Sequence, residues 1–426
     1  MYDRFHKLVL TALAVALALA GCAPQGPSVV RAAEQRSELP RVNPDASAET
    51  HVPELVEGNT EFALDLYRAL FNAQENQFSS PYSISLALAM TLAGASGETA
   101  AAMLSTLHLP AQDVLHAAFN ALDTALRSRG LTVKEEERFR LNIVNALWGQ
   151  QGQHFQSAFL DTLAQYYNAG LRTLDFEKAT EAARQAINSW VEEQTEGRIE
   201  DLLPEGSLEP STALVLTNAI YFNASWQFPF RPEATQDGPF RLLDGGEVTV
   251  PMMYQNVELR YVDGSGYQAI ELPYTGGELS MLVILPDQGA FAGWAGGLDP
   301  ALLNEVVSGL ATRQVALTLP RFSFTSEVAL KEALQRLGMA QAFSDSADFR
   351  GMTGQRELFI DEVFHKAFVA VDEEGTEAAA ATAVVMGRVS MPLDPIAMVV
   401  DSPFLFLIRD VATGTLLFLG HVVNPA

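Results

Sequence analysis

The amino-acid sequence predicts a mixed α+β fold that is built as one large domain. Segments with helical spacing fill the early half of the chain, and apolar, β-rich segments fill the later half, without the regular alternation of strand and helix that is typical of doubly wound sheets. Of the 426 residues, 48% are hydrophobic and 19% are charged, so we expect a packed core. Residues 58–426 contain neither a repeat nor a second linker, which favours a single domain.

Residues 1–21 predict a signal peptide that leads into a lipid-attachment motif. Arg4, His6 and Lys7 precede an apolar run over 8–20 that is too short to cross a membrane as a helix. The run ends in L-A-G-C at 19–22, which resembles the bacterial lipobox, whose cysteine becomes the lipidated first residue of the mature protein. We therefore expect an exported lipoprotein of the cell envelope that faces the extracellular or the periplasmic side.

Cys22 is the only cysteine of the chain, so the sequence excludes an intramolecular disulfide. The alternative is an ordinary signal peptide followed by an incidental cysteine. We favour lipidation because a lone cysteine at this position has no other evident use, and acyl chains rather than a helix would then hold the protein at the membrane. Residues 22–57 are rich in proline, small and charged residues and lack an apolar period, which predicts a flexible tether.

Two segments show the spacing of amphipathic helices. Asn59 or Thr60 is the candidate N-cap of the first helix and Thr180 that of the second, which we expect to stop near Gly197. The apolar residues of the two helices are Phe62, Leu66, Ala69 and Leu70 in the first and Ala183, Ile187, Trp190 and Val191 in the second.

Apolar, β-rich segments predict strands. They cover 141–148, 213–222, 279–286, 314–320, 363–371, 404–408 and 414–423. One segment between two of these strands is unusual, because D-E-E-G-T-E-A-A-A-A-T-A at 372–383 has the composition of a helix although strands flank it.

The charge and the motif content exclude several classes of function. The formal net charge of −25 argues against a nucleic-acid partner and against heparin-like polyanions, because such partners need clustered lysine and arginine. The seven histidines show no H-E-x-x-H or other common metal spacing, and the chain has no G-x-S-x-G, G-x-G-x-x-G or Walker motif. An unrelated hydrolase, in which Ser, His and Asp meet only in the folded chain, is left as an alternative.

An ordered set of segments along 58–426 resembles the motifs of the serpin family. They are F-S-S-P-Y-S-I at 78–84, N-S-W-V at 188–191 with T-E-G-R-I at 195–199, L-T-N-A-I-Y-F at 216–222 with Trp226 and Phe230, E-L-P-Y at 271–274, L-P-R-F at 319–322, V-F-H-K-A at 363–367, D-E-E-G-T-E-A-A-A-A-T at 372–382 and D-S-P-F-L-F at 401–406. No single segment is specific, but the ordered set is. One departure is Asn223-Ala224, where the family usually has Lys-Gly.

The resemblance implies a serpin fold with a large central β-sheet, further sheets, surrounding helices and an exposed reactive-centre loop at about 373–395. It also implies a suicide-type inhibitor of extracellular serine, or sometimes cysteine, proteases. The target protease cuts the loop and becomes acyl-linked to it, and the loop then inserts into the central sheet and distorts the protease. Because such an inhibitor is consumed, the resemblance implies no catalytic residue, metal or cofactor.

The hinge of this loop meets the physical demands of insertion. It comprises Glu373, Glu374, Gly375, Thr376, Glu377, Ala378, Ala379, Ala380, Ala381 and Thr382. A central strand donates a backbone hydrogen bond from nearly every residue, and no proline lies between Gly375 and Ser390. With period-two alternation, one face would carry the small or β-branched, uncharged residues Thr376, Ala378, Ala380, Thr382 and Val384. Glu377 would lie on the opposite face, and Gly375 would supply backbone freedom.

The bond that the protease cuts is predicted by counting along the loop. In inhibitory members the residue before this bond typically lies sixteen positions after the first hinge glutamate, and from Glu373 that count gives Val389, followed by Ser390. A Val389-Ser390 bond suits an elastase-like or other protease with a small apolar pocket. A loop shorter by one residue would make the bond Arg388-Val389 and the target trypsin-like; subtilisin-like enzymes are also candidates.

The resemblance also implies residues that support the opening of the sheet. Ser80, Ser83, Asn218 and His365 match the cluster beneath the centre of the sheet, where strands must part. Trp226 matches the tryptophan at the top of the sheet, where the hinge enters. A role in the core alone is the alternative for both His365 and Trp226.

The remaining expectations concern partners. Activation by heparin-like polyanions is not expected, because 111–129 contains only Arg127 and Arg129 as basic residues. We expect a monomer whose partners are a target protease and, through the lipid anchor, a membrane. The alternative function is that of a non-inhibitory serpin, a binding or chaperone-like module, although such members usually spoil the hinge with charge, bulk or proline.

Overall fold

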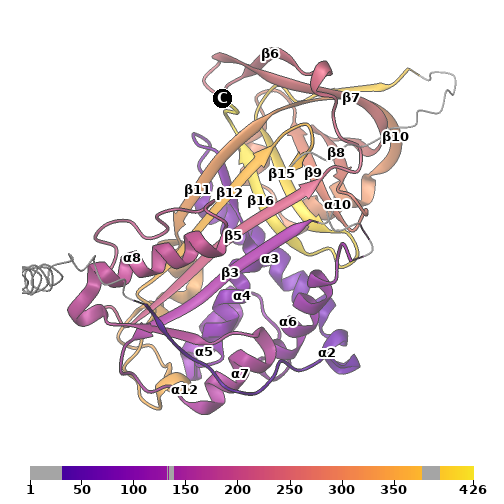
Figure 1. Cartoon of the computed structure of the whole chain (residues 1–426). Helices are drawn as coiled ribbons and strands as arrows, with labels where there is room; N and C mark the ends of the chain where they lie inside the picture. The colour runs from indigo at the N-terminus through magenta and orange to yellow at the C-terminus, as the bar shows by residue number, and fades with distance from the viewer. Residues whose placement is uncertain (1–30, 132, 134–138, 377–393) are drawn as a thin grey trace, which may run out of the picture. The chain divides into compact units, whose positions relative to one another are not determined.

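The structure of the protein is a computed structural model that describes residues 31–131, 133, 139–376 and 394–426 (Figure 1). The chain divides into a unit over Met1–Arg31 and a second unit over Ala32–Ala426. All helices and strands described below belong to the second unit.

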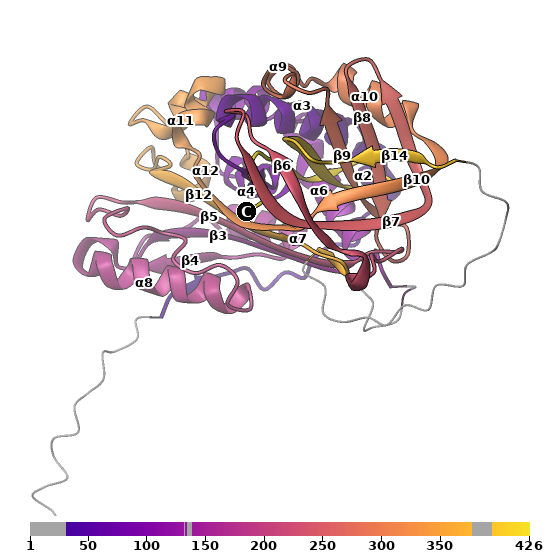
Figure 2. The same cartoon turned by 90° about the horizontal axis from the view of Figure 1, so that it is seen from above.

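A seven-stranded sheet runs through this unit and has helices on both faces (Figures 1 and 2). In order across the sheet, its strands are β1 (Ala33–Gln35), β4 (Leu171–Leu174), β3 (Arg140–Gln150), β5 (Leu214–Ser225), β13 (Gly375–Thr376), β12 (Glu362–Val371) and β11 (Phe322–Ala329). The middle strand β5 is buried from Leu214 to Phe222, which explains why most of its residues are apolar on both faces rather than on alternate positions; the polar residues Thr217 and Asn218 in this run are buried as well.

A nine-stranded sheet forms the other half of the β-structure. Its strands, in order, are β14 (Ile396–Val399), β10 (Ala311–Pro320), β7 (Glu247–Gly264), β8 (Tyr267–Pro273), β9 (Leu279–Pro286), β15 (Phe404–Asp410), β16 (Leu416–Val422) and β2 (Gln77–Ser79), while β6 (Gln236–Arg241) pairs with β7. Strands β15 and β16 are buried throughout, because aromatic and aliphatic side chains fill both of their faces.

The helices lie mainly on one side of the seven-stranded sheet, and α8 covers the other (Figure 2). They are α2 (Ala46–Thr50), α3 (Val52–Leu70), α4 (Pro81–Leu92), α5 (Gly97–Thr106), α6 (Gln112–Arg127), α7 (Ser157–Tyr167), α8 (Phe176–Gln194), α9 (Phe291–Gly296), α10 (Pro300–Gly309), α11 (Lys331–Leu334) and α12 (Arg350–Thr353). Every residue of α4 is buried, as is typical of a helix that is apolar on all sides. Within the described ranges, no helix combines the length and the hydropathy needed to cross a bilayer.

The segments expected to be strands are confirmed as β3, β5, β9, β10, β12, β15 and β16. The long strand β7 was not predicted. Its buried and exposed residues alternate irregularly and proline interrupts them at position 251, so its sequence lacks a clean apolar run.

Both predicted helices exist, but their starts differ from the predictions. The first, α3, begins at Val52, and Asn59 and Thr60 lie inside it; the Thr60 hydroxyl donates to the carbonyl of Val56. The second, α8, is capped by Asp175, whose carboxylate accepts from the Lys178 N–H. Its backbone leaves helical geometry at Ala179, which explains why the following threonine resembled a helix start.

The end of α8 is as expected. The helix stops at Gln194, and Gly197 follows with a φ of 77°, a conformation that favours glycine.

The predicted tether over 22–57 is wrong for its described part. Ala33–Gln35 form strand β1 on the edge of the seven-stranded sheet, opposite Leu171–Thr173 of β4. Further on, the Val42 N–H donates to Gln165 of α7, and Arg41 pairs with Asp123 of α6 at 2.7 Å. The segment is ordered by docking onto a free strand edge and onto helices, and its own sequence carries no period that reveals this.

Candidate functional site

The hinge residues Gly375 and Thr376 form the short strand β13, which lies between the ends of β5 and β12. It is antiparallel to both neighbours: Thr376 pairs with Ala224 on β5 and with Val371 on β12. Beyond β13, the two neighbours pair directly with one another and in parallel, Glu362–Ala367 against Val215–Ile220. At one end of the sheet, β5 and β12 are therefore separated by the first residues of the hinge. Along the rest of their length, the two strands are paired directly with one another.

Gly375 is required by the close approach of two backbones. A β-carbon at this position would lie 2.1 Å from the carbonyl oxygen of Ala224 and 2.8 Å from the α-carbon of Ser225, so any side chain collides with β5. Its φ is not positive. The glycine thus allows contact between strands, in contrast to the backbone freedom that its sequence context suggested.

Thr376 points into the interior of the protein. Its side chain is 1% exposed, and its Oγ1 lies 2.7 Å from the hydroxyl of Tyr274. Tyr274 stacks on Trp226, with ring centroids 4.7 Å apart and planes 9° apart. The indole N–H of Trp226 donates to the carbonyl of Asp372 at 3.0 Å. The structure therefore places Trp226 directly against the turn that leads into the hinge.

The acidic residues before Gly375 build that turn. The Asp372 carboxylate accepts hydrogen bonds from the N–H groups of Glu374 and Gly375. The Glu373 carboxylate accepts a hydrogen bond of 2.7 Å from the Thr235 hydroxyl and lies 3.5 Å from Arg321. Burial raises the pKa of Glu373, but these hydrogen bonds and the charge of Arg321 outweigh it and lower the pKa overall. Glu373 is accordingly held as a carboxylate at the top of the sheet.

A buried hydrogen-bonded cluster crosses the sheet where β5 and β12 pair directly. His365 of β12 lies opposite Asn218 of β5, and its Nδ1 is 2.5 Å from Asn218 Oδ1. The His365 Nε2 is 3.2 Å from the backbone N–H of Ser80. Because this N–H can only donate, Nε2 accepts and the ring proton lies on Nδ1, which donates to Asn218.

The cluster continues from Asn218 to the start of helix α4 and to β3. Asn218 Nδ2 donates to the Ser83 hydroxyl at 2.7 Å and to Asn145 Oδ1 at 2.5 Å. The Ser80 hydroxyl donates to the carbonyl of Leu417 on β16, so the cluster also reaches the second sheet. All four residues matched to the sheet-opening cluster, Ser80, Ser83, Asn218 and His365, are thus brought together.

Burial lowers the pKa of His365 to about 3. The neutral ring is required by the hydrogen-bond pattern as well, since a protonated Nε2 would face the Ser80 N–H with a second proton. The cluster is therefore held together by neutral hydrogen bonds.

Two members of the site, Asn145 and Tyr274, were not predicted. Asn145 accepts from both Ser83 and Asn218, and its Nδ2 donates to the carbonyl of Ser83 at 3.1 Å. The only signal in the sequence is an asparagine in the middle of an apolar strand, and Tyr274 lies in a matched motif without any sign of its role.

Several predicted site residues lie outside the described residues. They are Cys22, Arg388, Val389, Ser390 and the hinge positions Glu377, Ala378, Ala379, Ala380, Ala381 and Thr382. In the part of the chain that the structure describes, no group of three His, Cys, Asp or Glu side chains is arranged to hold a metal ion.

Comparison with known proteins identifies a family that the chain matches. The family model described as "Serpin (serine protease inhibitor)" matches residues 57–425. An uncharacterized serpin-like protein of Thermococcus kodakarensis is 37% identical over 99% of both chains. The leukocyte elastase inhibitor of Sus scrofa is 42% identical over 87% of this chain and 100% of its own length.

Solved structures agree with the sequence relatives. The crystal structure of tengpin, a thermophilic serpin, in its native state superimposes with a TM-score of 0.80 at 27% sequence identity. The match covers 93% of this chain and 100% of the tengpin chain. The mixed α+β architecture with several sheets is therefore shared with proteins of solved structure.

Proposed function

The chain belongs to the serpin family, and from this premise we propose that it is a suicide-type inhibitor of extracellular serine proteases. Members of the family are generally protease inhibitors rather than catalysts. The similarity to a leukocyte elastase inhibitor supports a protease as the partner. Cysteine proteases are a secondary class of target.

The proposed reaction begins on the reactive-centre loop. The serine hydroxyl of the protease attacks the carbonyl carbon of Val389, the Val389–Ser390 amide bond breaks, and the new amino terminus at Ser390 takes up the proton. The protease is then held as an ester on Val389. Insertion of the hinge between β5 and β12 before water can hydrolyse this ester would trap the acyl complex.

The pairing around β13 is the observation that carries the proposal. Two parallel strands in the centre of the sheet leave a place for one strand that runs antiparallel to both, and β13 already has this direction. Parallel pairs have slanted hydrogen bonds and are slightly less stable per residue than antiparallel ones. An inserted strand therefore exchanges one weaker ladder for two stronger ladders.

The register of β13 supports the same conclusion. If the hinge continues in the register of Thr376, then the sixth residue further on, Thr382, comes opposite Asn218 on β5 and His365 on β12. Asn218 and His365 are themselves direct partners, so both neighbouring strands accept the new strand without a shift. The hydroxyl of Thr382 would then take a place between the two residues whose mutual hydrogen bond insertion must break.

The alternation of the hinge agrees with this register. Thr376 faces the interior, so Ala378, Ala380, Thr382 and Val384 would follow it inward. Their small or β-branched, uncharged side chains can enter a packed interior without burying charge.

The target class follows from the proposed bond. Valine before the cut suits an elastase-like protease, in agreement with the names of the elastase inhibitor relatives. Cleavage after Arg388 would instead indicate a trypsin-like target. Lipidation of Cys22 would hold the inhibitor at a membrane of the cell envelope, facing the extracellular or the periplasmic side.

The experiment that tests the proposal is incubation of the full-length protein with elastase-like, trypsin-like and subtilisin-like proteases. We expect a protease complex that survives SDS and a released fragment that begins at Ser390. A fragment that begins at Val389 would move the bond to Arg388. Cleavage without such a complex would reject inhibition and favour the non-inhibitory binding module.

A further inference from the structure

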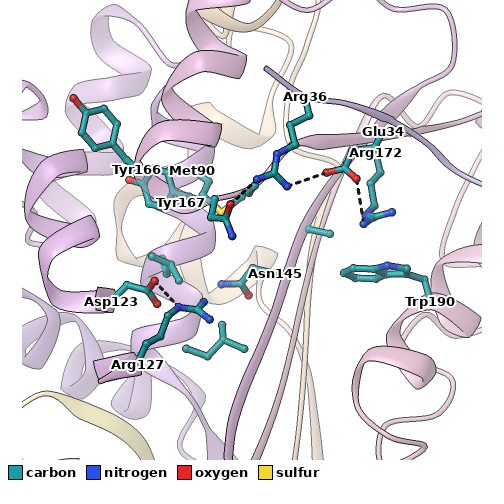
Figure 3. A pocket seen from close by; sticks show the side chains of 16 residues that line it. Glu34, Arg36, Met90, Asp123, Arg127, Asn145, Tyr166, Tyr167, Arg172 and Trp190 are labelled. Carbon is teal, nitrogen blue, oxygen red and sulfur yellow. Dashed lines mark hydrogen bonds and ion pairs between the residues drawn. The ribbon is translucent and has the colours of Figure 1, made fainter. Parts of the chain in front are cut away.

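A pocket of about 250 Å³ lies beside β3 on the flank of the seven-stranded sheet (Figure 3). Its lining comes from the N-terminal segment, α4, α6, β3, the end of α7, β4 and α8. Arg36 and Glu34 form one wall, Arg172 and Trp190 another, and Asp123 with Arg127 a third, while Asn145 lies between them (Figure 3).

The charges around this pocket do not balance. Asp123 is shared by Arg41, at 2.7 Å, and Arg127, at 2.8 Å. Glu34 is likewise shared by Arg172 and Arg36, at 3.7 and 3.9 Å. Three guanidinium groups, those of Arg36, Arg127 and Arg172, and two carboxylates line the pocket, and Arg41 binds Asp123 from outside the lining. This leaves an excess of positive charge in a chain whose formal net charge is −25.

Two of these arginines retain donors for a ligand. The distances from Glu34 to Arg36 and to Arg172 are longer than a hydrogen bond, so Glu34 forms ion pairs with these arginines without occupying their N–H donors. Within the described residues, the Arg172 guanidinium makes no hydrogen bond and lies over the Trp190 ring, 4.6 Å from its centroid. Arg36 uses one nitrogen to donate to Asn168 Oδ1 at 2.5 Å.

We propose that this pocket binds a small polyvalent anion, a carboxylate or a phosphate, between Arg36 and Arg172 on one side and Arg127 on the other. Guanidinium groups bind such anions through paired N–H donors, and charge-assisted hydrogen bonds are the strong ones. The pocket has room for a small molecule only, which separates this ligand from a heparin-like polymer.

The site depends on a segment outside the family domain. The family match begins at residue 57, so Glu34, Arg36 and Arg41 lie before it. This segment reaches the pocket because β1 pairs with β4 and because Arg41 binds Asp123. The anion site thus combines residues of the serpin domain, among them Arg127 and Arg172, with Glu34 and Arg36 from the segment before it.

The pocket shares one residue with the hydrogen-bonded cluster around Asn218 and His365. Asn145 lines the pocket and accepts hydrogen bonds from Ser83 and Asn218. On the proposed function, one inserted strand widens the sheet by about 4.8 Å, so β3 must shift relative to α6 and the pocket must change shape. An anion that fits the present shape therefore favours the uninserted state by mass action.

Binding is tested by isothermal titration calorimetry of the full-length protein with citrate and with inorganic pyrophosphate. We expect saturable binding of at least one anion at constant ionic strength, and Arg36→Gln or Arg172→Gln should weaken it about tenfold or more. Arg241→Gln is the matched control for Arg36→Gln, because the Arg241 side chain is about as exposed as that of Arg36 and is also paired with a carboxylate, but it does not line the pocket. The tighter ligand identifies carboxylate or phosphate as the preferred group.

A second readout comes from Trp190. Movement of the Arg172 guanidinium toward an anion should change the fluorescence of this tryptophan, and the change should vanish in Trp190→Phe. Absence of binding by both anions, or equal weakening by Arg241→Gln, would overturn the site.

The coupling to the sheet has a separate test. Saturating anion should slow the loss of inhibitory activity on heating at least several-fold in the parent protein but not in Arg172→Gln. If binding occurs without this effect, the coupling is rejected and the site stands. Because calorimetry needs no protease, a failure of the proposed inhibition is distinguished from a failure of the site.

Discussion

Gly375 illustrates how one residue fixes the start of the hinge. With a β-carbon 2.1 Å from the Ala224 carbonyl oxygen, Gly375→Ala should push β13 away from β5 and raise the number of inhibitor molecules consumed per protease by tenfold or more. The control is Gly293→Ala, because no atom lies within 4 Å of a β-carbon there. Stoichiometry titrations check both variants, and an unchanged stoichiometry in Gly375→Ala would refute the close-approach argument.

Because its pKa is lowered by burial, His365 should make the free energy of unfolding decrease as the pH falls. Its pKa falls from about 6.5 when unfolded to about 3 when folded, so its contribution is fully present above pH 6.5 and is lost as the pH falls toward 3. By linkage, protonation of this one group in the unfolded state should lower the free energy of unfolding by roughly 2 kcal/mol between pH 6.5 and 4.5. His116 and His421, each with a pKa lowered to about 4 by burial, act in the same direction.

Urea unfolding at a series of pH values measures this dependence. His365→Gln should flatten the curve below pH 6.5, and His154→Gln, which changes an exposed histidine, should leave it unchanged. Equal curves for His365→Gln and the parent protein would contradict the assignment of a neutral, buried ring.

At the scale of residues, the sequence predicts which residues belong to the site better than it predicts their hydrogen-bond partners. Ser80, Ser83, Asn218 and His365 follow from their motifs, but the proton on His365 Nδ1 depends on the Ser80 N–H, 285 residues away in the chain. Asn145 escapes prediction for the same reason: its partners lie on α4 and β5, and only the fold brings them together.

The proposed alternation of inward-facing and outward-facing side chains along the hinge can be tested by substitution. Ala380→Arg, or Thr376→Pro, should turn the protein from an inhibitor into a substrate, because charge on the inward face or a missing N–H blocks insertion. Glu377→Lys is the control, since this position would lie on the opposite face and already carries a charge. Electrophoresis in SDS after reaction with elastase distinguishes the complex from cleaved product, and a complex in normal yield from Ala380→Arg would exclude the proposed face.

At the scale of elements, the sequence predicts the most apolar strands but neither β7, β8 and β11 nor the structure of the N-terminal segment. β5 and β15 are recognisable in the sequence because both are largely buried and most of their residues are apolar. β1 has only three residues, A-E-Q, and owes its structure to the free edge of β4. A segment that is ordered only by what it docks against carries no signal of its own.

At the scale of the whole molecule, the mixed α+β class was predictable but the order of strands was not. The parallel pair at the centre joins β5 to β12, which are separated in the chain by the four helices α9 to α12 and by several strands of the other sheet. Pairing over such a separation is a product of tertiary packing, and a single sequence specifies it only through resemblance to a family.

The lipid anchor is a prediction about the whole molecule as well. Cys22→Ser should move the exported protein from the membrane fraction to the soluble fraction without changing its inhibition of proteases, because lipidation would supply the membrane link. Fractionation and immunoblotting of cells that express the two forms measure this. Persistent membrane attachment of Cys22→Ser would remove the lipobox interpretation.

The proposed inhibition requires that the segment after Thr376 becomes a middle strand of the seven-stranded sheet. Hydrogen–deuterium exchange of the peptide that covers 376–385, before and after cleavage by an elastase-like protease, tests this most directly. We predict that the amide protons beyond Thr376 exchange slower by orders of magnitude after cleavage than before it, because each would then be bonded within the sheet. Free exchange in the cleaved protein would contradict the claim.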